Sequence, residues 1–241
     1  MDLGIAGRTA VVTGASRGIG AAVAAALSAE GVRVVGVSRG GGIDVTAPDA
    51  ARLIAETTGG VDILVNNAGT SSVTALDELT DEDWQAQWDL NVNAPRRLMQ
   101  ALAPGMAERG WGRIVNVVSS SGKRPSLTNA AYSVTKAAQL SLSRVFAEAY
   151  AARGVLVNAV APGPVDGPLW MDPGGLADQA AAARRISREQ VLADQAAKVP
   201  ICRFATPEEI AGVIAFLCSE QASMVVGAAW SVDGGAVPGI L

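Results

Sequence analysis

Short apolar segments alternate along this chain with longer segments of helical character, and this alternation constrains the fold more than any other feature. The apolar segments are rich in β-branched residues and end at turn-forming residues, as strands buried on both faces do. They cover residues 9–13, 32–38, 61–65, 113–118, 155–160 and 230–232. Helices are expected at residues 18–30, 51–57, 80–108 with an interruption near 91–95, 130–153, in an Ala-rich stretch that ends at 198, and from 206 to about 219. This order predicts an α/β fold, a doubly wound parallel β-sheet with helices on both faces.

Length and charge limit the classes of protein to consider. The 241 residues contain no repeat of fixed period, low-complexity tail or linker, which favours a single domain over residues 1–241. The net charge is −4 and no run of basic residues is longer than a pair such as Arg96-Arg97, so there is no basic stripe for a nucleic acid. The apolar run 210–218 is too short for a membrane span, and residues 1–7 lack the features of a signal peptide. Cys202 and Cys218 lack metal-ligand spacing and indicate a reduced compartment. We expect a soluble cytoplasmic protein without a metal, nucleic-acid or membrane partner.

The chain contains no histidine, which restricts the chemistry it can perform. A Ser-His-Asp triad, a Cys-His pair and a His-ligated metal are all excluded. Proton transfer at neutral pH must use Asp, Glu, Lys, Tyr or Cys.

A glycine-rich turn joins the first predicted strand to the first predicted helix. Its residues are Gly14, Ala15, Ser16, Arg17, Gly18, Ile19 and Gly20. Glycines permit a tight turn and let the N–H groups at the start of the helix approach a pyrophosphate. A plain tight turn is the alternative, but the position between a buried strand and a helix favours nucleotide binding.

The end of the second strand indicates which nucleotide is bound. Sites for NAD often place a carboxylate there, whereas this chain has Ser38 and Arg39. An arginine can pair with a 2′-phosphate, and Arg17 is a second candidate. The residues favour NADP over NAD, with two solvated arginines as the alternative.

Tyr132 and Lys136 are four residues apart at the start of a predicted helix, so they share one face. A free phenol has a pKa of about 10, and a neighbouring ammonium lowers it. The pair is therefore a candidate acid/base unit. A surface lysine beside a half-buried tyrosine is the alternative if the pair stands alone.

The pair belongs to an ordered set of motifs. TGASRGIG at 13–20, NNAG at 66–69, Asn91, Ser119, Tyr132 and Lys136 occur in this order, and Ser119 precedes Tyr132 by 13 residues. Pro162-Gly163 and VDGG at 232–235 complete the set. This set resembles the short-chain dehydrogenase/reductase family, in particular its 3-oxoacyl-[acyl-carrier-protein] reductase-like members, over nearly the whole chain.

The resemblance implies a Rossmann fold and a role for each motif. Tyr132 would transfer the proton at the substrate oxygen, Ser119 would hydrogen-bond that oxygen, and Lys136 would hold the nicotinamide ribose and lower the pKa of Tyr132. Asn91 would bind a water that links Lys136 to solvent. The implied cofactor contacts are those of the glycine turn with Ser38 and Arg39, together with Asp44, Val45, Asn66, Ala68, Gly69, Tyr132, Lys136, Pro162, Gly163 and Val165.

The implied activity is an NADP-dependent ketone reductase or secondary-alcohol dehydrogenase, with a 3-oxoacyl thioester as a candidate substrate. The alternatives are a nucleotide-sensing protein without turnover, a dehydratase or epimerase that keeps its cofactor bound, and an NAD-dependent dehydrogenase of a small cyclic alcohol. The resemblance also implies a homotetramer or homodimer formed through residues 94–108 and 130–153. Proline at 95 has no N–H for the carbonyl of Asn91, which would leave that carbonyl free for the water.

Several segments depart from the family pattern or lie outside it. The stretch from Ser38 to Asp44 is short, so the helix between the second and third strands is expected to be missing. Gly167 stands where the family commonly has a threonine that bonds the carboxamide. Lys123 and Arg124 are candidates for an anionic substrate or are simply solvated. Residues 168–199, which begin with Pro168, Leu169, Trp170 and Met171, are expected to form a lid over the substrate rather than a plain pair of surface helices.

Overall fold

Six parallel strands form one sheet, in the order β2-β1-β3-β4-β5-β6, within residues 2–239 that the computed structural model describes. The strands are β1 Thr9–Thr13, β2 Arg33–Val37, β3 Ile63–Asn66, β4 Gly112–Val117, β5 Val155–Pro162 and β6 Ala229–Val232. The chain runs outward from β1 to β2 and then returns to β3 on the other side of β1. Connections leave the sheet in opposite directions at this point, which opens a crevice at the carboxyl ends of the strands.

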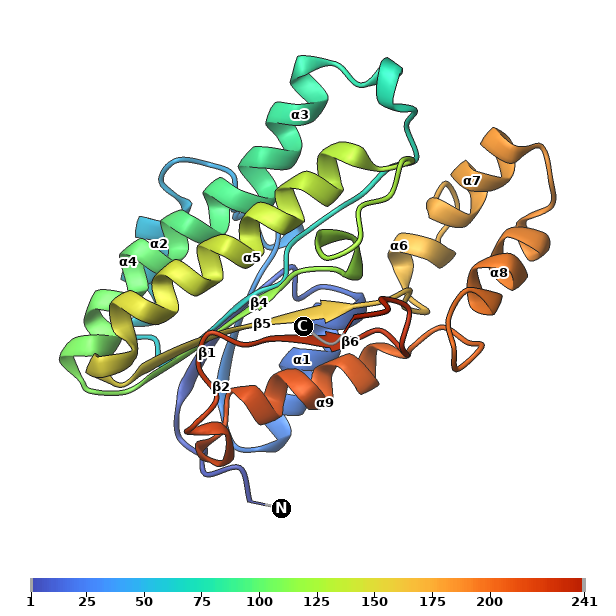
Figure 1. The fold of residues 1–241 in the computed structure, drawn as a ribbon. Coiled ribbons are helices and arrows are strands. Elements are labelled where there is room, and N and C mark those ends of the chain that lie inside the picture. The colour runs from blue at the N-terminus through green and yellow to red at the C-terminus, as the bar shows by residue number, and fades with distance from the viewer. Residues whose placement is uncertain (1, 240–241) are drawn as a thin grey trace.

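Helices cover both faces of the sheet (Figure 1). On one face, α1 Gly18–Ala29 and α9 Pro207–Leu217 pack against Val12 and Val65. On the other face, α2 Ala50–Thr58, α4 Ala94–Glu108 and α5 Ala130–Tyr150 pack against Val11 and Leu64. Adjacent residues of a strand point to opposite faces, so each central strand is apolar on both sides. The predicted doubly wound sheet with helices on both faces is confirmed.

The helical zone from residue 80 to residue 108 consists of three pieces. Thr80 caps α3 Asp81–Trp88 through a capping box with Asp83. A π-helical segment, η3 Asp89–Asn93, follows and continues into α4. In η3 the N–H of Ala94 bonds the carbonyl of Asp89, five residues back. The interruption predicted near residues 91–95 is therefore a π-helical segment, and it coincides with Pro95, which cannot donate to the carbonyl of Asn91.

The connection after β2 corrects one prediction. Only a 3-10 turn, Arg39–Gly41, separates Ser38 from Asp44, and the Ser38 hydroxyl accepts a hydrogen bond from the N–H of Gly41 at 3.2 Å. However, α2 lies between β2 and β3, in agreement with the helix expected over residues 51–57. The prediction that a helix is missing between these strands is therefore wrong. The short stretch from Ser38 to Asp44 has room only for the 3-10 turn, and the helix follows after Asp44.

Three short helices lie beyond the carboxyl ends of the strands: α6 Pro168–Met171, α7 Leu176–Arg184 and α8 Arg188–Ala197. They form a separate arm beside the crevice (Figure 1). No helix in the described part of the chain is long and apolar enough to cross a membrane.

Candidate active site

A cleft of about 790 Å³ lies at the carboxyl ends of the strands. Most of the residues that the sequence predicts for the site line it: Gly14, Ser16, Arg17, Gly18, Ile19, Ser38, Arg39, Asp44, Val45, Ala68, Gly69, Ser119, Tyr132, Lys136, Pro162, Gly163 and Val165. Gly20, Asn66 and Asn91 are not among the lining residues. Convergence of segments this far apart in the sequence follows from the parallel sheet, which brings all carboxyl ends to one edge.

The glycine turn forms one wall of the cleft. Gly14 has φ +67° and Gly18 has φ +54°, a left-handed conformation that favours glycine. A Cβ at Gly20 would lie 2.2 Å from the carbonyl oxygen of Gly14, so Gly20 packs behind the turn rather than in the cleft. Helix α1 starts there with no side-chain cap and no acidic residue in its first turn. Its first N–H groups therefore suit the pyrophosphate of a dinucleotide.

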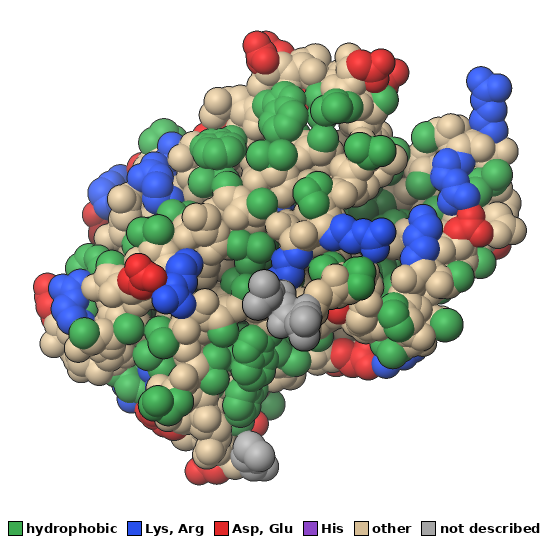
Figure 2. All heavy atoms as spheres, viewed as in Figure 1, with side chains coloured by type: hydrophobic (Ala, Val, Ile, Leu, Met, Phe, Trp, Pro, Cys, Tyr) green, Lys and Arg blue, Asp and Glu red, His purple; other side chains and the backbone are tan. Residues whose placement is uncertain are grey.

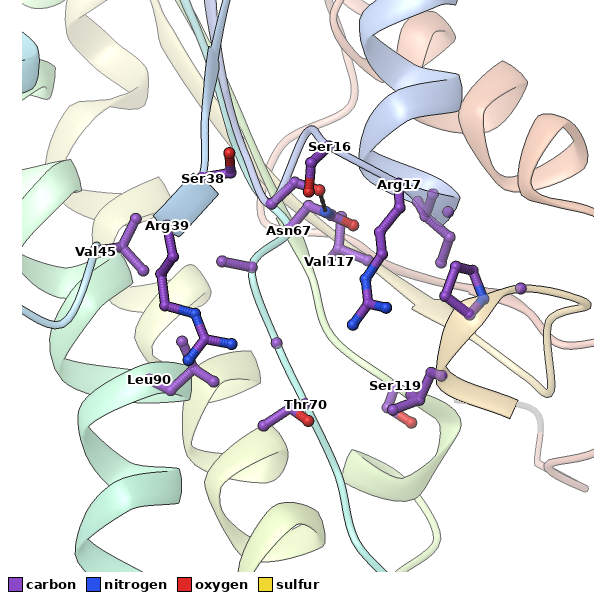
Figure 3. A pocket seen from close by; sticks show the side chains of 18 of the residues that line it. Ser16, Arg17, Ser38, Arg39, Val45, Asn67, Thr70, Leu90, Val117 and Ser119 are labelled. Atoms are coloured by element: carbon purple, nitrogen blue, oxygen red, sulfur yellow. Dashed lines mark hydrogen bonds between the residues drawn. The ribbon is translucent and has the colours of Figure 1, made fainter. Parts of the chain in front are cut away.

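Two arginines reach into the cleft (Figure 3). Arg17 extends from the glycine turn and Arg39 from the end of β2, on opposite sides. Arg17 forms an ion pair with Asp172 at 2.8 Å. Asp44 accepts hydrogen bonds from the backbone and side chain of Thr46, which together with the charge of Arg39 lower the pKa of its carboxyl. No carboxylate occupies the end of β2, where sites for NAD often place one.

Ser119, Tyr132 and Lys136 line the same cleft. Ser119 follows β4, and its hydroxyl bonds the side chain of Tyr132. Tyr132 and Lys136 come from the first two turns of α5, and the Lys136 Nζ lies 5.6 Å from the centroid of the Tyr132 ring. The Lys136 ammonium is buried and donates to the carbonyl of Val117 and the Oε1 of Gln139, both at 2.9 Å.

A family model described as enoyl-(acyl carrier protein) reductase matches residues 42–237. The 3-oxoacyl-[acyl-carrier-protein] reductase FabG of Vibrio cholerae is 34% identical over 254 residues, which cover 97% of this chain and 98% of the relative. D-beta-hydroxybutyrate dehydrogenase of Cupriavidus necator is 33% identical, over 95% of this chain and 97% of the relative. The crystal structure of L-sorbose reductase from Gluconobacter frateurii, complexed with NADPH and L-sorbose, superposes with a TM-score of 0.89 at 35% identity and covers 100% of both chains.

The chain belongs to the short-chain dehydrogenase/reductase family. Its similar proteins are dehydrogenases and reductases that interconvert alcohol and carbonyl groups, and the chain is an NAD(P)-dependent oxidoreductase of this kind. The fold and the order of motifs agree with this membership, since the cleft brings the glycine turn and the Ser119–Tyr132–Lys136 set to one edge of the sheet.

The pKa values in this reductase differ from the prediction that Lys136 lowers the pKa of Tyr132. Burial raises the pKa of Tyr132, and the hydrogen bond with Ser119 lowers it only in part. Burial also lowers the pKa of Lys136 to about 7. The two groups share a desolvated pocket, which disfavours the charged form of both. The Lys136 Nζ lies near the Tyr132 ring and is only partly charged near neutral pH. It therefore stabilises the phenolate less than a fully charged ammonium beside the phenol oxygen would.

Asn66 and Asn67 occupy different places from those that the sequence indicates. Asn66 is buried and donates to the side chain of Asn116 on β4 at 2.8 Å, so its assignment to the ribose region is corrected. Asn67 lines the cleft, and its amide bonds the carbonyls of Thr13 and Gly14 at 2.9 and 3.3 Å. The difference is one residue at a strand end, where neighbouring side chains point in opposite directions.

Asn91 lies behind the cleft in η3. Its amide nitrogen donates to Gln87 at 2.8 Å and to Thr135 of α5 at 3.0 Å, so it ties η3 to α5. A Cβ built on Gly69 would lie 3.7 Å from both the Asn91 Oδ1 and the Lys136 Nζ, which places Asn91 close to Lys136. The role of the Asn91 carbonyl with a water stays a prediction.

Lys123 and Arg124 are engaged within the protein. The Lys123 ammonium donates to the carbonyl of Ala229 at 2.6 Å and to the Ser231 hydroxyl at 2.9 Å. Arg124 donates to the carbonyl of Ala236 at 3.5 Å. Both residues thus tie the loop after β4 to β6 and the segment that follows it, and neither lines the cleft. These contacts give no support to the alternative that Lys123 and Arg124 bind an anionic substrate.

The arm formed by α6, α7 and α8 contacts both rims of the cleft. Leu169 and Trp170 line the cleft, whereas Met171 does not. Gln179 of α7 accepts a hydrogen bond from the N–H of Val73 at 2.8 Å, in the loop after β3. These contacts favour the lid that the sequence predicts over a plain pair of surface helices.

Gln139 is a residue that the sequence interpretation missed. It is three residues after Lys136 on α5, so it shares the buried face of that helix. This spacing from Lys136 was the available signal. Gln139 contacts the Lys136 ammonium directly, at 2.9 Å.

Proposed function

We propose that this protein is an NADP(H)-dependent reductase of ketones, which also oxidises the corresponding secondary alcohols. The observation that carries this proposal is that one cleft is lined by Arg17, Arg39, Ser119, Tyr132 and Lys136 together. A dinucleotide bound along this cleft would bring its nicotinamide to the hydroxyl groups of Ser119 and Tyr132.

The glycine turn and the start of α1 would hold the pyrophosphate. Arg39, with Arg17, would pair with the 2′-phosphate, because a guanidinium presents a fork of donors to a phosphate. Ser38, Asp44 and Val45 line the adenosine end. The L-sorbose reductase of similar fold was solved with NADPH, which supports the same choice here.

The carboxamide end of the cofactor site lacks one side chain. Pro162, Gly163 and Val165 line the cleft, and the backbone of Val165 pairs with Ala205. Gly167 also lines the cleft but has no hydroxyl. We expect backbone groups alone to bond the carboxamide.

The bound nicotinamide supplies the hydride, and the chain handles the proton. Tyr132 donates its phenol proton to the carbonyl oxygen of the substrate, while the Ser119 hydroxyl bonds the same oxygen and orients it. Burial raises the pKa of Tyr132, which keeps the phenol protonated at neutral pH, as reduction requires. Lys136 directs its ammonium to the ribose hydroxyls and supplies positive charge as the phenolate forms.

The substrate end of the cleft is partly apolar. Leu169 and Trp170 of α6 line the same cleft as Ser119 and Tyr132. This lining suits a ketone with an apolar body, and a 3-oxoacyl thioester fits that description. Curated relatives reduce 3-oxoacyl groups by name, and the similar solved structure holds a ketose, so both substrates belong in a first panel.

Absorbance at the nicotinamide band tests the proposal directly. The protein is mixed with NADPH or NADH and a panel of 3-oxoacyl thioesters, simple ketones and ketoses. We expect NADPH consumption with at least one ketone and slower consumption of NADH. Tight NADPH binding without consumption across the panel would instead support a nucleotide sensor, and NADH consumption with a cyclic alcohol product would support the NAD-dependent alternative.

We further propose a cytoplasmic homotetramer or homodimer assembled through α4 and α5. Hydrophobic side chains gather over α5 and the neighbouring end of α3 (Figure 2). Trp88, Val134 and Val145 are 39, 45 and 60% exposed in the single chain. Light scattering on the wild type and on Val145→Glu tests this assembly, because a buried charge at the interface would reduce the mass.

A further inference from the structure

The Lys136 side chain is almost completely buried. Lys136 is 2% exposed and Gln139 is 1% exposed. Two of the three ammonium N–H donors have partners, the carbonyl of Val117 and the Oε1 of Gln139, each at 2.9 Å. Lys136 also lines the cleft, so the third donor is the one that can reach a ligand there.

The orientation of the Gln139 amide follows from chemistry. An ammonium only donates hydrogen bonds, so the amide must turn its oxygen toward Lys136. Burying a glutamine costs free energy unless its polar atoms are satisfied. This amide has a specific partner on the buried face of α5, the ammonium that the proposed reaction needs.

We propose that Gln139 is a positioning residue for the reaction: its Oε1 fixes the Lys136 ammonium, favours its charged form and leaves one N–H to point into the cleft. This inference rests on the proposed role of Lys136. Gln139 itself touches neither the substrate nor the cofactor, because it does not line the cleft.

Other charged groups near α5 do not replace this acceptor. Tyr132 shares the pocket of Lys136, and Asp89 of η3 lines the same cleft but accepts hydrogen bonds from Gln85 and Asn93. Neither β5 nor the turn Ser120–Gly122 carries a titratable side chain. The remaining charged groups on elements packed against α5, or lining the cleft, lie at the surface, at the nucleotide end, or at the far end of a strand: Asp81, Glu82, Asp83, Arg96, Arg97, Glu108, Arg153, Arg17, Arg39, Asp44 and Arg113.

The test uses the small number of lysines. The chain has three, Lys123, Lys136 and Lys198, so the protein labelled with ¹³Cε-lysine gives three resolvable NMR signals. Lys123→Arg and Lys198→Arg assign them. The pKa of Lys136 is then measured by pH titration in the wild type, in Gln139→Met and in Gln139→Glu, without cofactor.

Opposite shifts are expected from the two substitutions. Methionine keeps the length of the side chain but removes the acceptor, so the pKa of Lys136 falls by about one pH unit. Glutamate keeps an acceptor and adds a negative charge, so the pKa rises. In the NADPH-linked assay, the basic limb of kcat/KM moves in the same direction for each variant, because activity requires the ammonium.

Ser143→Ala is the matched control, because Ser143 is on the same buried face of α5, one turn further, and its hydroxyl has no hydrogen-bond partner among residues 2–239. It should leave both the Lys136 pKa and the pH profile in place. An unmoved pKa in Gln139→Met and Gln139→Glu overturns the inference, and so does a moved pKa with an unmoved pH profile. A wild type without any turnover contradicts the proposed function instead, and the titration distinguishes the two failures.

Discussion

Arg17 and Asp172 form an ion pair between the glycine turn and the end of α6, with 2.8 Å between the guanidinium and the carboxylate. The two residues are 155 positions apart in the sequence. The same guanidinium is proposed to bind a phosphate of the cofactor. Asp172 therefore competes with the nucleotide for Arg17, and it links the arm of α6, α7 and α8 to the state of the cofactor site.

Neutralising Asp172 should strengthen nucleotide binding. Both side chains are about half exposed or more, and exposed ion pairs are weak, so we expect the Kd of Asp172→Asn for NADPH to fall by only about two- to fivefold. Fluorescence titration at low salt measures it. Glu56→Gln is the control, since it removes the same charge from an exposed ion pair with Arg52 away from the cleft. A weaker affinity in Asp172→Asn would contradict the competition.

Replacing Arg39 should change the choice of nucleotide. In Arg39→Asp the new carboxylate repels a 2′-phosphate and accepts a hydrogen bond from a ribose 2′-hydroxyl. We expect the ratio of kcat/KM for NADPH to that for NADH to fall by about 10- to 100-fold, the range of a charge-assisted hydrogen bond. Arg39→Gln removes the positive charge without adding a negative one, so its ratio should lie between those of the wild type and Arg39→Asp. An unchanged ratio would refute the assignment of Arg39.

Tyr132 should be essential for turnover and dispensable for binding. Tyr132→Phe removes the proton donor and is expected to lower kcat by about 10²- to 10⁴-fold, the usual contribution of general acid catalysis. The Kd for NADPH should stay within about twofold of the wild type. The chain has only one other tyrosine, Tyr150, which stacks on Phe146 at the far end of α5. Tyr150→Phe is therefore a matched control, and equal losses in both variants would argue against a specific role.

The strands and the main site could be predicted from sequence for physical reasons. Central strands of a parallel sheet are apolar throughout, so β1 and β3 can be recognised as strands from their continuous apolar sequences. The parallel sheet then brings Gly14, Ser119 and Tyr132 to one edge, whatever their separation in sequence. These steps need only periodicity, burial and the order of the motifs.

Other features depend on contacts that no local pattern encodes. Which of Asn66 and Asn67 faces the cleft depends on where β3 ends, and a shift of one residue reverses the answer. The ion pair of Arg17 with Asp172 requires the fold of the arm. The pKa of Tyr132 depends on how deeply α5 is buried, which the spacing to Lys136 does not indicate. A role for Gln139 is indicated only by its contact with the Lys136 ammonium, which the sequence does not show.

Lys136 should also control how stability depends on pH. Its pKa is about 7 in the folded chain and near its ordinary 10.5 when unfolded, so the unfolded chain binds more protons between these values and stability rises with pH. The raised pKa of Cys218 opposes this above about pH 9. At constant protein concentration and without nucleotide, the free energy of unfolding should increase by about 2–3 kcal/mol from pH 7 to pH 9, because each pKa unit corresponds to about 1.4 kcal/mol. Chemical denaturation measures it. Lys136→Met should abolish the increase, Lys198→Met at an exposed position should preserve it, and a persistent increase in Lys136→Met would show that another group carries the titration.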